Sequence, residues 1–219
     1  MLVLGIDTCC MPATSAVYDG EKLVGEALLN SLELKPADID CFAVAAGPGS
    51  FTGVRIGTAT IKAMAHAAGK PCAAVSTLEA LANNVPYFDG IICPILDARR
   101  NQVYTAEFLG DGTLTRVCED KAVSLESLLD ELKNLKKKVL FLGDGVLVYR
   151  EEILEYLGDN AKFAKGNNNL NMAGSVAELG YEAALSGDTI SYAKLAPNYI
   201  RLSQAERERL ERKTETKEI

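Results

Sequence analysis

Histidine is almost absent from this sequence, since His66 is the single one among 219 residues. A metal site built from several histidines is therefore excluded, and a Ser-His-Asp triad would have to use His66. This residue stands in a predicted helix, between Ala65 and Ala67. We expect a buried or interface histidine and not a catalytic one.

Paired cysteines of the C-x-x-C type are also absent, although the chain holds six cysteines. Cys41, Cys72 and Cys93 lie inside apolar runs. In a chain of this length, isolated cysteines in apolar surroundings indicate reduced thiols of the core and not a disulfide framework.

Positive charge is in short supply, with 23 basic against 30 acidic residues and a net charge of −7. Such a field does not favour nucleic acid, so we expect any RNA partner to be held by another subunit. No apolar run approaches the roughly 18 residues that cross a bilayer, and residues 1–10 contain no charged leader region. We therefore expect a cytoplasmic protein without a membrane partner.

Glycine is concentrated in residues 47–57, which read GPGSFTGVRIG. The apolar run 41–46 predicts a buried strand before this stretch, and residues 58–68 predict a helix that ends at Gly69. The stretch is thus a predicted strand-to-helix turn, either tightly packed or an anion site at a helix N-terminus. It matches neither a Walker A loop nor a G-x-G-x-x-G fingerprint. The residues alone leave both interpretations open.

The second half of the chain repeats the pattern of the first. Predicted strands are 1–6, 15–18, 22–28, 41–46 and 72–75, then 91–96, 102–108, 114–118, 139–142 and 161–164; predicted helices are 58–68 and 78–83, then 125–135 and 146–157. Two βββαβα units in tandem predict a duplicated α/β fold of the actin/sugar-kinase/Hsp70 (ASKHA) superfamily. A break near 84–90 divides an N-terminal lobe, 1–86, from a C-terminal lobe, 87–219. The second lobe would also contain a helix at 174–185 and a mixed-charge extension at 205–217, a solvated helix or a tail.

Four segments, in order, resemble the TsaB family, also called YeaZ, of bacterial tRNA threonylcarbamoyladenosine (t6A) biosynthesis. They are Leu4 to Thr8, Gly47 to Gly57, Val75 to Ala82, and Pro197 to Arg201 followed by Ala205-Glu206. The resemblance spans most of the chain, and the eleven-residue signature at 47–57 is specific to this family and its catalytic paralogue, the TsaD family. It implies a scaffold subunit required for t6A modification.

The resemblance also implies that this chain lacks the catalytic metal. The TsaD family has a His-x-x-x-His pair shortly after the strand that follows the signature helix, and the matching positions here are Thr77 and Leu81. Leu81 has no donor atom, and Thr77 cannot bind a transition metal in the same way. We expect no catalytic residue, no metal and no cofactor.

A small-molecule kinase of the same superfamily is the first alternative. It needs acidic strand ends for Mg²⁺ and glycine turns for phosphates. Asp7, Asp97, Gly143, Asp144 and Gly145 are weak candidates. Alternatively, the first two aspartates only close hairpin turns.

The implied partner is a TsaD-like catalytic paralogue, which pairs with the N-terminal lobe. A TsaE-like ATPase would join this heterodimer, a homodimer of similar arrangement is possible, and tRNA would be reached only through the complex. Candidate interface residues are Gly49, Ser50, Phe51, Thr52, Gly53, Arg55, Ile56, Thr60 and Ala63. Small residues at Gly57, Ala59, Ala63 and Ala67 allow another helix to approach, although close packing within the chain would look the same. The second alternative is a homodimeric binding protein unrelated to tRNA.

The sequence departs from the family pattern at residues 29–41. The family usually has an amphipathic helix between the third strand and the signature strand, and this connection is too short for one. Either the helix is lost or the sequence omits residues. We expect an omission, because deletion would uncover one face of the sheet and part of the interface.

Overall fold

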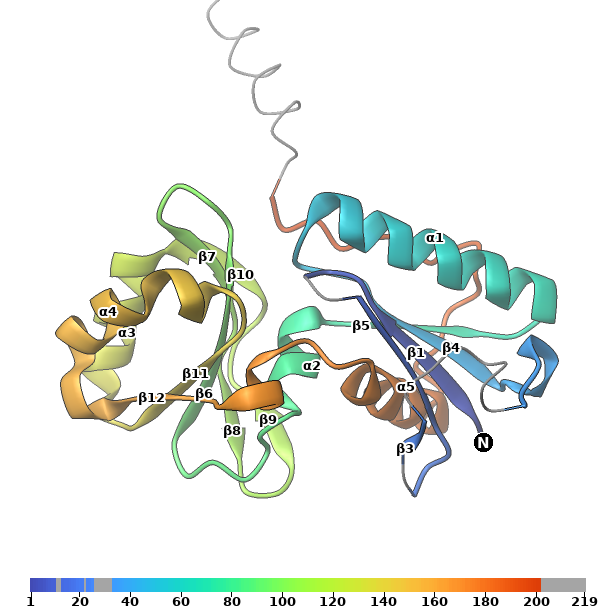
Figure 1. Cartoon of the computed structure of the whole chain (residues 1–219), viewed down its shortest axis with the longest axis horizontal. Helices are drawn as coiled ribbons and strands as arrows, with labels where there is room; N and C mark the ends of the chain where they lie inside the picture. The colour runs from blue at the N-terminus through green and yellow to red at the C-terminus, as the bar shows by residue number, and fades with distance from the viewer. Residues whose placement is uncertain (11–12, 22, 26–32, 202–219) are drawn as a thin grey trace, which may run out of the picture.

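The computed structural model describes residues 1–10, 13–21, 23–25 and 33–201. Figure 1 shows two α/β lobes side by side. The extension predicted at 205–217, most of the strand predicted at 22–28 and residues 29–32 of the short 29–41 connection lie outside the described residues. The described part of that connection holds one short 3-10 helix, η2 (Pro36–Asp38).

The first lobe is built on a five-stranded sheet in the order β3-β2-β1-β4-β5. The strands are β1 (Val3–Asp7), β2 (Thr14–Tyr18), β3 (Leu23–Gly25), β4 (Cys41–Ala45) and β5 (Cys72–Val75). β2 is antiparallel to β1, whereas β4 and β5 run parallel to it. Every residue of β4 is buried, which matches the uninterrupted apolar run from which this strand was predicted.

Two helices cover the two faces of this sheet. Phe42 and Val44 pack with the buried side of α1 (Phe51–Ala68), whereas Ala43 and Ala45 pack with α5 (Ala173–Ser186). Figure 1 shows α1 and α5 on opposite sides of β4 and β1. The central strand is therefore buried from both directions.

The position of α5 differs from the one expected from chain order. Its sequence lies after the second repeat, yet the helix contacts β1, β2, β4 and β5 of the first lobe. Gly5 and Gly180 allow this contact, because a Cβ on Gly5 would lie 2.6 Å from the Ala173 carbonyl oxygen and one on Gly180 would overlap the Ala43 side chain. Farther on, Ile190 pairs with Cys72 of β5. The chain thus crosses into the second lobe near residue 86 and returns at α5.

The second lobe repeats the sheet in the order β10-β7-β6-β11-β12. Its strands are β6 (Ile91–Asp97), β7 (Gln102–Thr105), β8 (Phe108–Gly110), β9 (Leu114–Arg116), β10 (Lys121–Ser124), β11 (Val139–Leu142) and β12 (Ala161–Phe163). These five positions match β3-β2-β1-β4-β5, so the duplicated fold is confirmed. The strand expected at 114–118 forms at Leu114–Arg116 as β9, but it is not the third strand of the repeat, because β10 occupies that position.

The reason is that the seven-residue β6 has two antiparallel partners. Its far half, Ile95 to Asp97, pairs with β7, while Ile91 and Ile92 pair with β8. The strand predicted at 102–108 therefore divides, and the β8–β9 hairpin is an addition to the repeat. Alternation of apolar residues cannot show which partner a strand takes.

The helices of the second lobe are α3 (Leu125–Leu135) and α4 (Gly145–Leu157), with 3-10 turns η3 (Gly158–Asn160) and η4 (Gly166–Asn169). Ser124 caps α3 by accepting a hydrogen bond from the Ser127 amide. Leu125, Leu128, Leu129 and Leu132 of α3 are buried in one core with residues of β6, β11 and α4, whereas Leu135 at the end of the helix is exposed.

A short helix, α2 (Thr77–Ala82), joins the lobes. Leu78 and Leu81 pack into a core shared with Ile92 and Phe108 of the second lobe. Arg116 adds a half-buried ion pair across the boundary, with its Nη2 at 2.7 Å from Glu79 Oε2. Among the described residues, no helix is long and apolar enough to span a membrane.

We predict that Gly180→Ala destabilises the protein by about 1–3 kcal/mol, because the added methyl group overpacks the contact with Ala43. Helix propensity alone predicts the opposite, a gain of up to about 1 kcal/mol. Urea unfolding followed by circular dichroism measures the sign. Leu185→Ala, at an exposed position of the same helix, is the control and should change stability by less than about 0.5 kcal/mol. Stabilisation by Gly180→Ala would contradict the packing described for α5.

Candidate partner surface and interlobe cleft

The glycine signature is a turn followed by the first two turns of a helix. α1 begins at Phe51, seven residues before the predicted start at 58, and Ser50 caps it by accepting a hydrogen bond from the Gly53 amide at 3.3 Å. The turn was predicted over residues 47–57, with Gly49 to Gly57 as its main part. From Phe51 onward that prediction was wrong, because these residues are helical. Gly53 and Gly57 had suggested a turn, but both are helical.

These glycines serve a close approach between α1 and the end of β1. A Cβ on Gly53 would overlap the Thr8 carbonyl oxygen, and one on Gly57 would overlap the Thr8 hydroxyl group. Thr8 Oγ1 donates a hydrogen bond to the Gly53 carbonyl at 2.7 Å, and the Ser50 amide donates one to the Cys9 carbonyl at 2.7 Å. The tight-packing interpretation therefore accounts for the glycines at 53 and 57.

A C-terminal strap, residues 197–201, holds the start of α1 from the other side. The Asn198 amide donates to the Ala46 carbonyl at 2.7 Å. The Tyr199 ring stacks on Phe51 with centroids 4.7 Å apart, and its hydroxyl accepts a hydrogen bond from Arg55 Nε at 2.8 Å. Two segments of the family resemblance thus meet in space, a contact that sequence reasoning did not predict.

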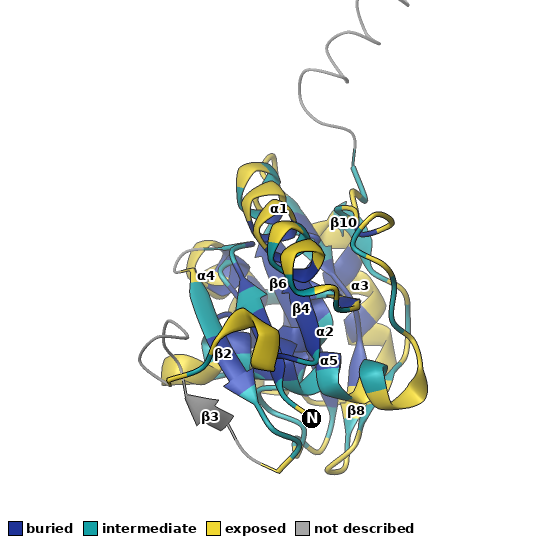
Figure 2. Cartoon of the chain, turned by 90° about the vertical axis from the view of Figure 1, so that its right-hand side faces the viewer, coloured by how far each residue is buried: buried dark blue, intermediate teal, exposed yellow. Residues whose placement is uncertain are grey.

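The outward face of α1 is exposed and consists mainly of small and apolar residues. Ile56 is the largest, with 56% of its surface exposed. Arg55 and His66 are exposed along one edge of this face. Its small members are Thr52, Ala59, Thr60, Ala63 and Ala67. Figure 2 shows the helix as a largely exposed ridge over the buried sheet. We call Ile56 and these five small residues the α1 face.

The predicted interface residues divide into two groups. Ser50, Thr52, Arg55, Ile56, Thr60 and Ala63 are exposed, whereas Gly49, Phe51 and Gly53 are half-buried against the β1 end and the strap. Gly57, expected to admit another helix, is buried inside the lobe. His66 is exposed, and its ring stacks on that of Tyr192 with centroids 4.4 Å apart. The prediction that this histidine is buried was therefore wrong.

A cleft between the lobes begins at the same end of α1. Its walls come from the end of β1, the signature, the start of the β6–β7 turn, Tyr104, Asp144 and the strap. Of the five weak nucleotide candidates, Asp97 and Asp144 line this cleft. Asp7 does not, because it is completely buried.

Hydrogen bonds within the protein engage all three carboxylates. Asp7 accepts from the Cys9 amide and from Asn171 Nδ2, both at 2.8 Å. Asp144 accepts from the Asp97 amide at 3.0 Å, and Asp97 accepts from the Arg99 amide at 2.9 Å. Burial raises the pKa of Asp7 and that of Asp144. The bonds to Asp7 from Cys9 and to Asp97 from Arg99 span two residues and are those of turn-closing aspartates. The other two join segments far apart in the chain.

The two glycine candidates of the second lobe also have packing roles. A Cβ on Gly143 would overlap the Ile95 carbonyl oxygen, and one on Gly145 would lie 3.0 Å from it. The Gly143 amide also donates to Asn169. The structure therefore brings Asp144 and Asp97 together at the cleft and uses both glycines to pack α4 against β6.

The residues at the bottom of the cleft are poorly suited to nucleophilic or metal chemistry. Burial raises the pKa values of the Cys9 and Cys10 thiols, and nearby aspartates raise them further. Thr77 and Leu81 are fully buried. In the described part of the chain, no group of three or more His, Cys, Asp or Glu side chains could hold a metal ion.

The duplicated sheets and the cleft between them define a two-lobed protein of the ASKHA class. A solved ROK hexokinase from Thermus thermophilus matches with a TM-score of 0.53 and 11% identity, over 84% of this chain and 100% of that one. A crystal structure described as an uncharacterized protein with similarity to peptidase YEAZ from Pseudomonas aeruginosa matches with a TM-score of 0.77 and 22% identity, over 91% and 99% of the two chains. These likenesses show the fold.

Sequence comparison identifies the family. The family model for TsaD, tRNA N6-adenosine threonylcarbamoyltransferase, matches residues 22–209. The tRNA threonylcarbamoyladenosine biosynthesis protein TsaB of Bacillus subtilis (strain 168) is 39% identical over 181 residues, which cover 82% of this chain and 77% of that protein. The chain belongs to the TsaB family, also called YeaZ, and the resemblance of its four segments is confirmed.

We predict that Asp7→Asn stabilises the protein at pH 8 and has little effect near pH 4. The folded-state pKa of Asp7 lies above its ordinary value of 3.8, so ionisation costs more in the folded state than in the unfolded state. Native stability from this group is therefore lost as pH rises from about 3.8 through the folded pKa. Asparagine is neutral at every pH and can still accept the Cys9 hydrogen bond. Its amide nitrogen would face Asn171, so the Asn171 amide must rotate and accept through its oxygen to keep the second bond at every pH.

Thermal unfolding of both proteins from pH 4 to pH 8 tests this linkage. Asp159→Asn is the control because Asp159 is exposed in η3, and it should follow the wild type throughout. An Asp7→Asn variant that is less stable than the wild type at pH 8 would show that the carboxylate charge stabilises the fold.

Proposed function

We propose that this protein is a non-catalytic subunit that supports t6A modification of tRNA by pairing with a TsaD-like catalytic paralogue. Two comparisons support the reaction assigned. The Bacillus subtilis relative is named for threonylcarbamoyladenosine biosynthesis, and the model that matches residues 22–209 is that of the threonylcarbamoyltransferase itself. The subunit would work in the cytoplasm and reach tRNA within the complex.

The observation that carries this proposal is the α1 face. Its small side chains allow a second helix to approach closely, and exposed Ile56 supplies apolar area for burial. The glycines of α1 are already used inside the lobe, so the exposed residues are those left for a partner. A paralogue of the same fold would bring a matching helix.

The scaffold role is supported by the chemistry of the cleft. The Asp7 carboxylate is buried and bonded through both oxygens, and the cleft thiols have raised pKa values. Thr77 and Leu81 stand where the catalytic family has its metal ligands. Binding would therefore act by favouring the active arrangement of the partner.

Two further assemblies follow from the same proposal. A TsaE-like ATPase would dock on the heterodimer. A homodimer would use the α1 face of both copies, because a two-fold interface pairs one patch with itself. The homodimer and the heterodimer would then compete for one surface.

We predict that Ala63→Arg abolishes a complex with the paralogue, because a long charged side chain would be buried at the centre of the α1 face. Light scattering of the mixed proteins measures the complex mass. Leu147→Arg is the matched control, an exposed apolar residue of α4 in the other lobe, and it should leave the complex intact.

Other outcomes of this experiment select the alternatives. A stable homodimer that does not bind the paralogue would favour a homodimeric binding protein unrelated to tRNA. Mg²⁺-dependent ATP hydrolysis by the chain alone would favour a kinase. A complex that survives Ala63→Arg would contradict the interface proposed.

A further inference from the structure

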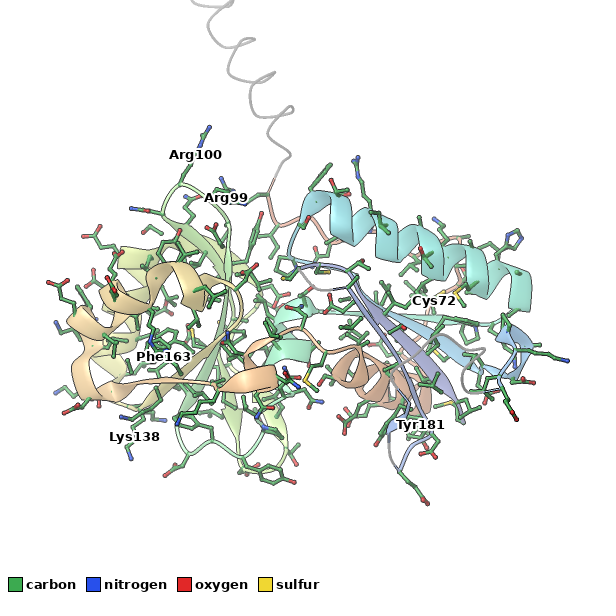
Figure 3. All side chains as sticks on the ribbon, in the orientation of Figure 1. Cys72, Arg99, Arg100, Lys138, Phe163 and Tyr181 are labelled. Atoms are coloured by element: carbon green, nitrogen blue, oxygen red, sulfur yellow. The ribbon has the colours of Figure 1, made fainter. Side chains whose placement is uncertain are left out.

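The turn between β6 and β7 has an unusual backbone at the mouth of the cleft. Arg99, Arg100 and Asn101 have φ angles of 65°, 57° and 54°, so three consecutive non-glycine residues are left-handed. Such residues are uncommon and collect at functional sites. Figure 3 shows Arg99 and Arg100 projecting from the top of the second lobe, beside the opening between the lobes.

Arginines from three separate elements meet at this opening. Arg55 of α1, Arg99 of the β6–β7 turn and Arg201 of the strap line one cleft. Arg201 Nη1 donates to the Ala98 carbonyl at 2.8 Å, which ties the strap to the turn. Arg100 follows Arg99 in the same turn and is exposed, although it does not line the cleft. The lining holds these three arginines against Asp97 and Asp144, so the cleft is weakly basic although the protein is acidic.

Most of these arginines form no ion pair with another described residue. The exception is Arg99, whose Nη1 lies 3.4 Å from Asp97 Oδ2. Within the described residues, no salt bridge joins Arg55, Arg100 or Arg201 to a carboxylate. Guanidinium groups without acidic partners are the groups that bind phosphate oxygens in pairs of hydrogen bonds.

Aromatic rings stand beside these arginines. Phe51, Tyr104 and Tyr199 line the same cleft, and 42% of the Tyr199 surface is exposed. A basic groove with exposed aromatic rings is the arrangement that binds single-stranded nucleic acid, because phosphates meet the cations and bases stack on the rings. The net charge of −7 does not oppose this, since charges beyond about 8 Å are screened at physiological salt.

We propose that the cleft mouth lined by Arg55, Arg99, Arg201 and Tyr199, with exposed Arg100 beside it in the turn, binds the phosphate backbone of a single-stranded RNA segment, such as a loop of tRNA. The identity of the RNA rests on the proposed function. The site goes beyond that function, because there the chain reaches tRNA only through its partner. A free nucleoside phosphate offers the same chemistry and must be distinguished by experiment.

The test is fluorescence anisotropy of a short labelled single-stranded RNA titrated with the full chain across a series of salt concentrations. Arg100→Glu should weaken binding about tenfold and reduce the slope of log K against log salt by about 0.7 for one lost phosphate contact. Arg150→Glu is the matched control, since Arg150 lies on α4 with its guanidinium over Phe163. Arg100→Lys should retain the slope.

Arg55→Gln, on α1 of the other lobe, is a second variant should Arg100→Glu disturb the turn, and it should also weaken binding. Equal affinities of Arg100→Glu and Arg150→Glu, or no binding of RNA by the wild type at low salt, would overturn the site. Displacement of the RNA by ADP at far lower concentration than by unlabelled RNA would assign the site to free nucleotides.

This experiment is separate from the test of the proposed function. Arg100→Glu should still form the complex with the paralogue, because Arg100 lies outside the α1 face. If Arg100→Glu loses RNA binding but still binds the paralogue, the result supports the RNA site independently of the proposed function. If the wild type binds RNA but does not bind the paralogue, the scaffold proposal is overturned and the RNA site is not.

Discussion

The approach of the β1 end to the start of α1 is the contact on which the rest of the first lobe depends. The helix backbone meets the Thr8 carbonyl at Gly53 and the Thr8 hydroxyl group at Gly57, and a Cβ at either position would overlap it. The paired hydrogen bonds of Thr8 and Ser50 fix the helix axis over the sheet. Because α1 is held through its inner side, its outer side remains available as a surface.

The C-terminal part of the chain completes this arrangement. α5 fills the opposite face of the first sheet, and the strap then passes the start of α1 to reach the second lobe at Ala98. The chain therefore leaves the first lobe, forms the second lobe and returns to the first. Together with the α2 core and the Arg116–Glu79 pair, the strap connects the lobes on both sides of the cleft.

Much of the fold could be predicted from the sequence, because apolar runs and turn residues mark strands and helices locally. Gly53 and Gly57 were wrongly interpreted as turn residues. Both are helical, and the absence of a Cβ there makes room for Thr8 and does not serve an unusual backbone conformation. The position of α5 could not be predicted, since its apolar stripe does not say which sheet it covers. The candidate interface residues came from the family resemblance, and their role in binding stays a prediction; the structure shows which of them are exposed. The contact of Tyr199 with Phe51 and Arg55 joins residues far apart in the chain, and no local pattern encodes it.

Hydrogen–deuterium exchange with and without the TsaD-like paralogue tests the central claim most directly, namely that the outward side of α1 is the partner surface. We expect amide hydrogens in peptides from residues 51–68 to exchange more slowly when the partner is added. Exchange in peptides from α4 should not change. Protection of α4 or of the β8–β9 hairpin, with α1 unaffected, would contradict this claim and move the partner surface to the second lobe.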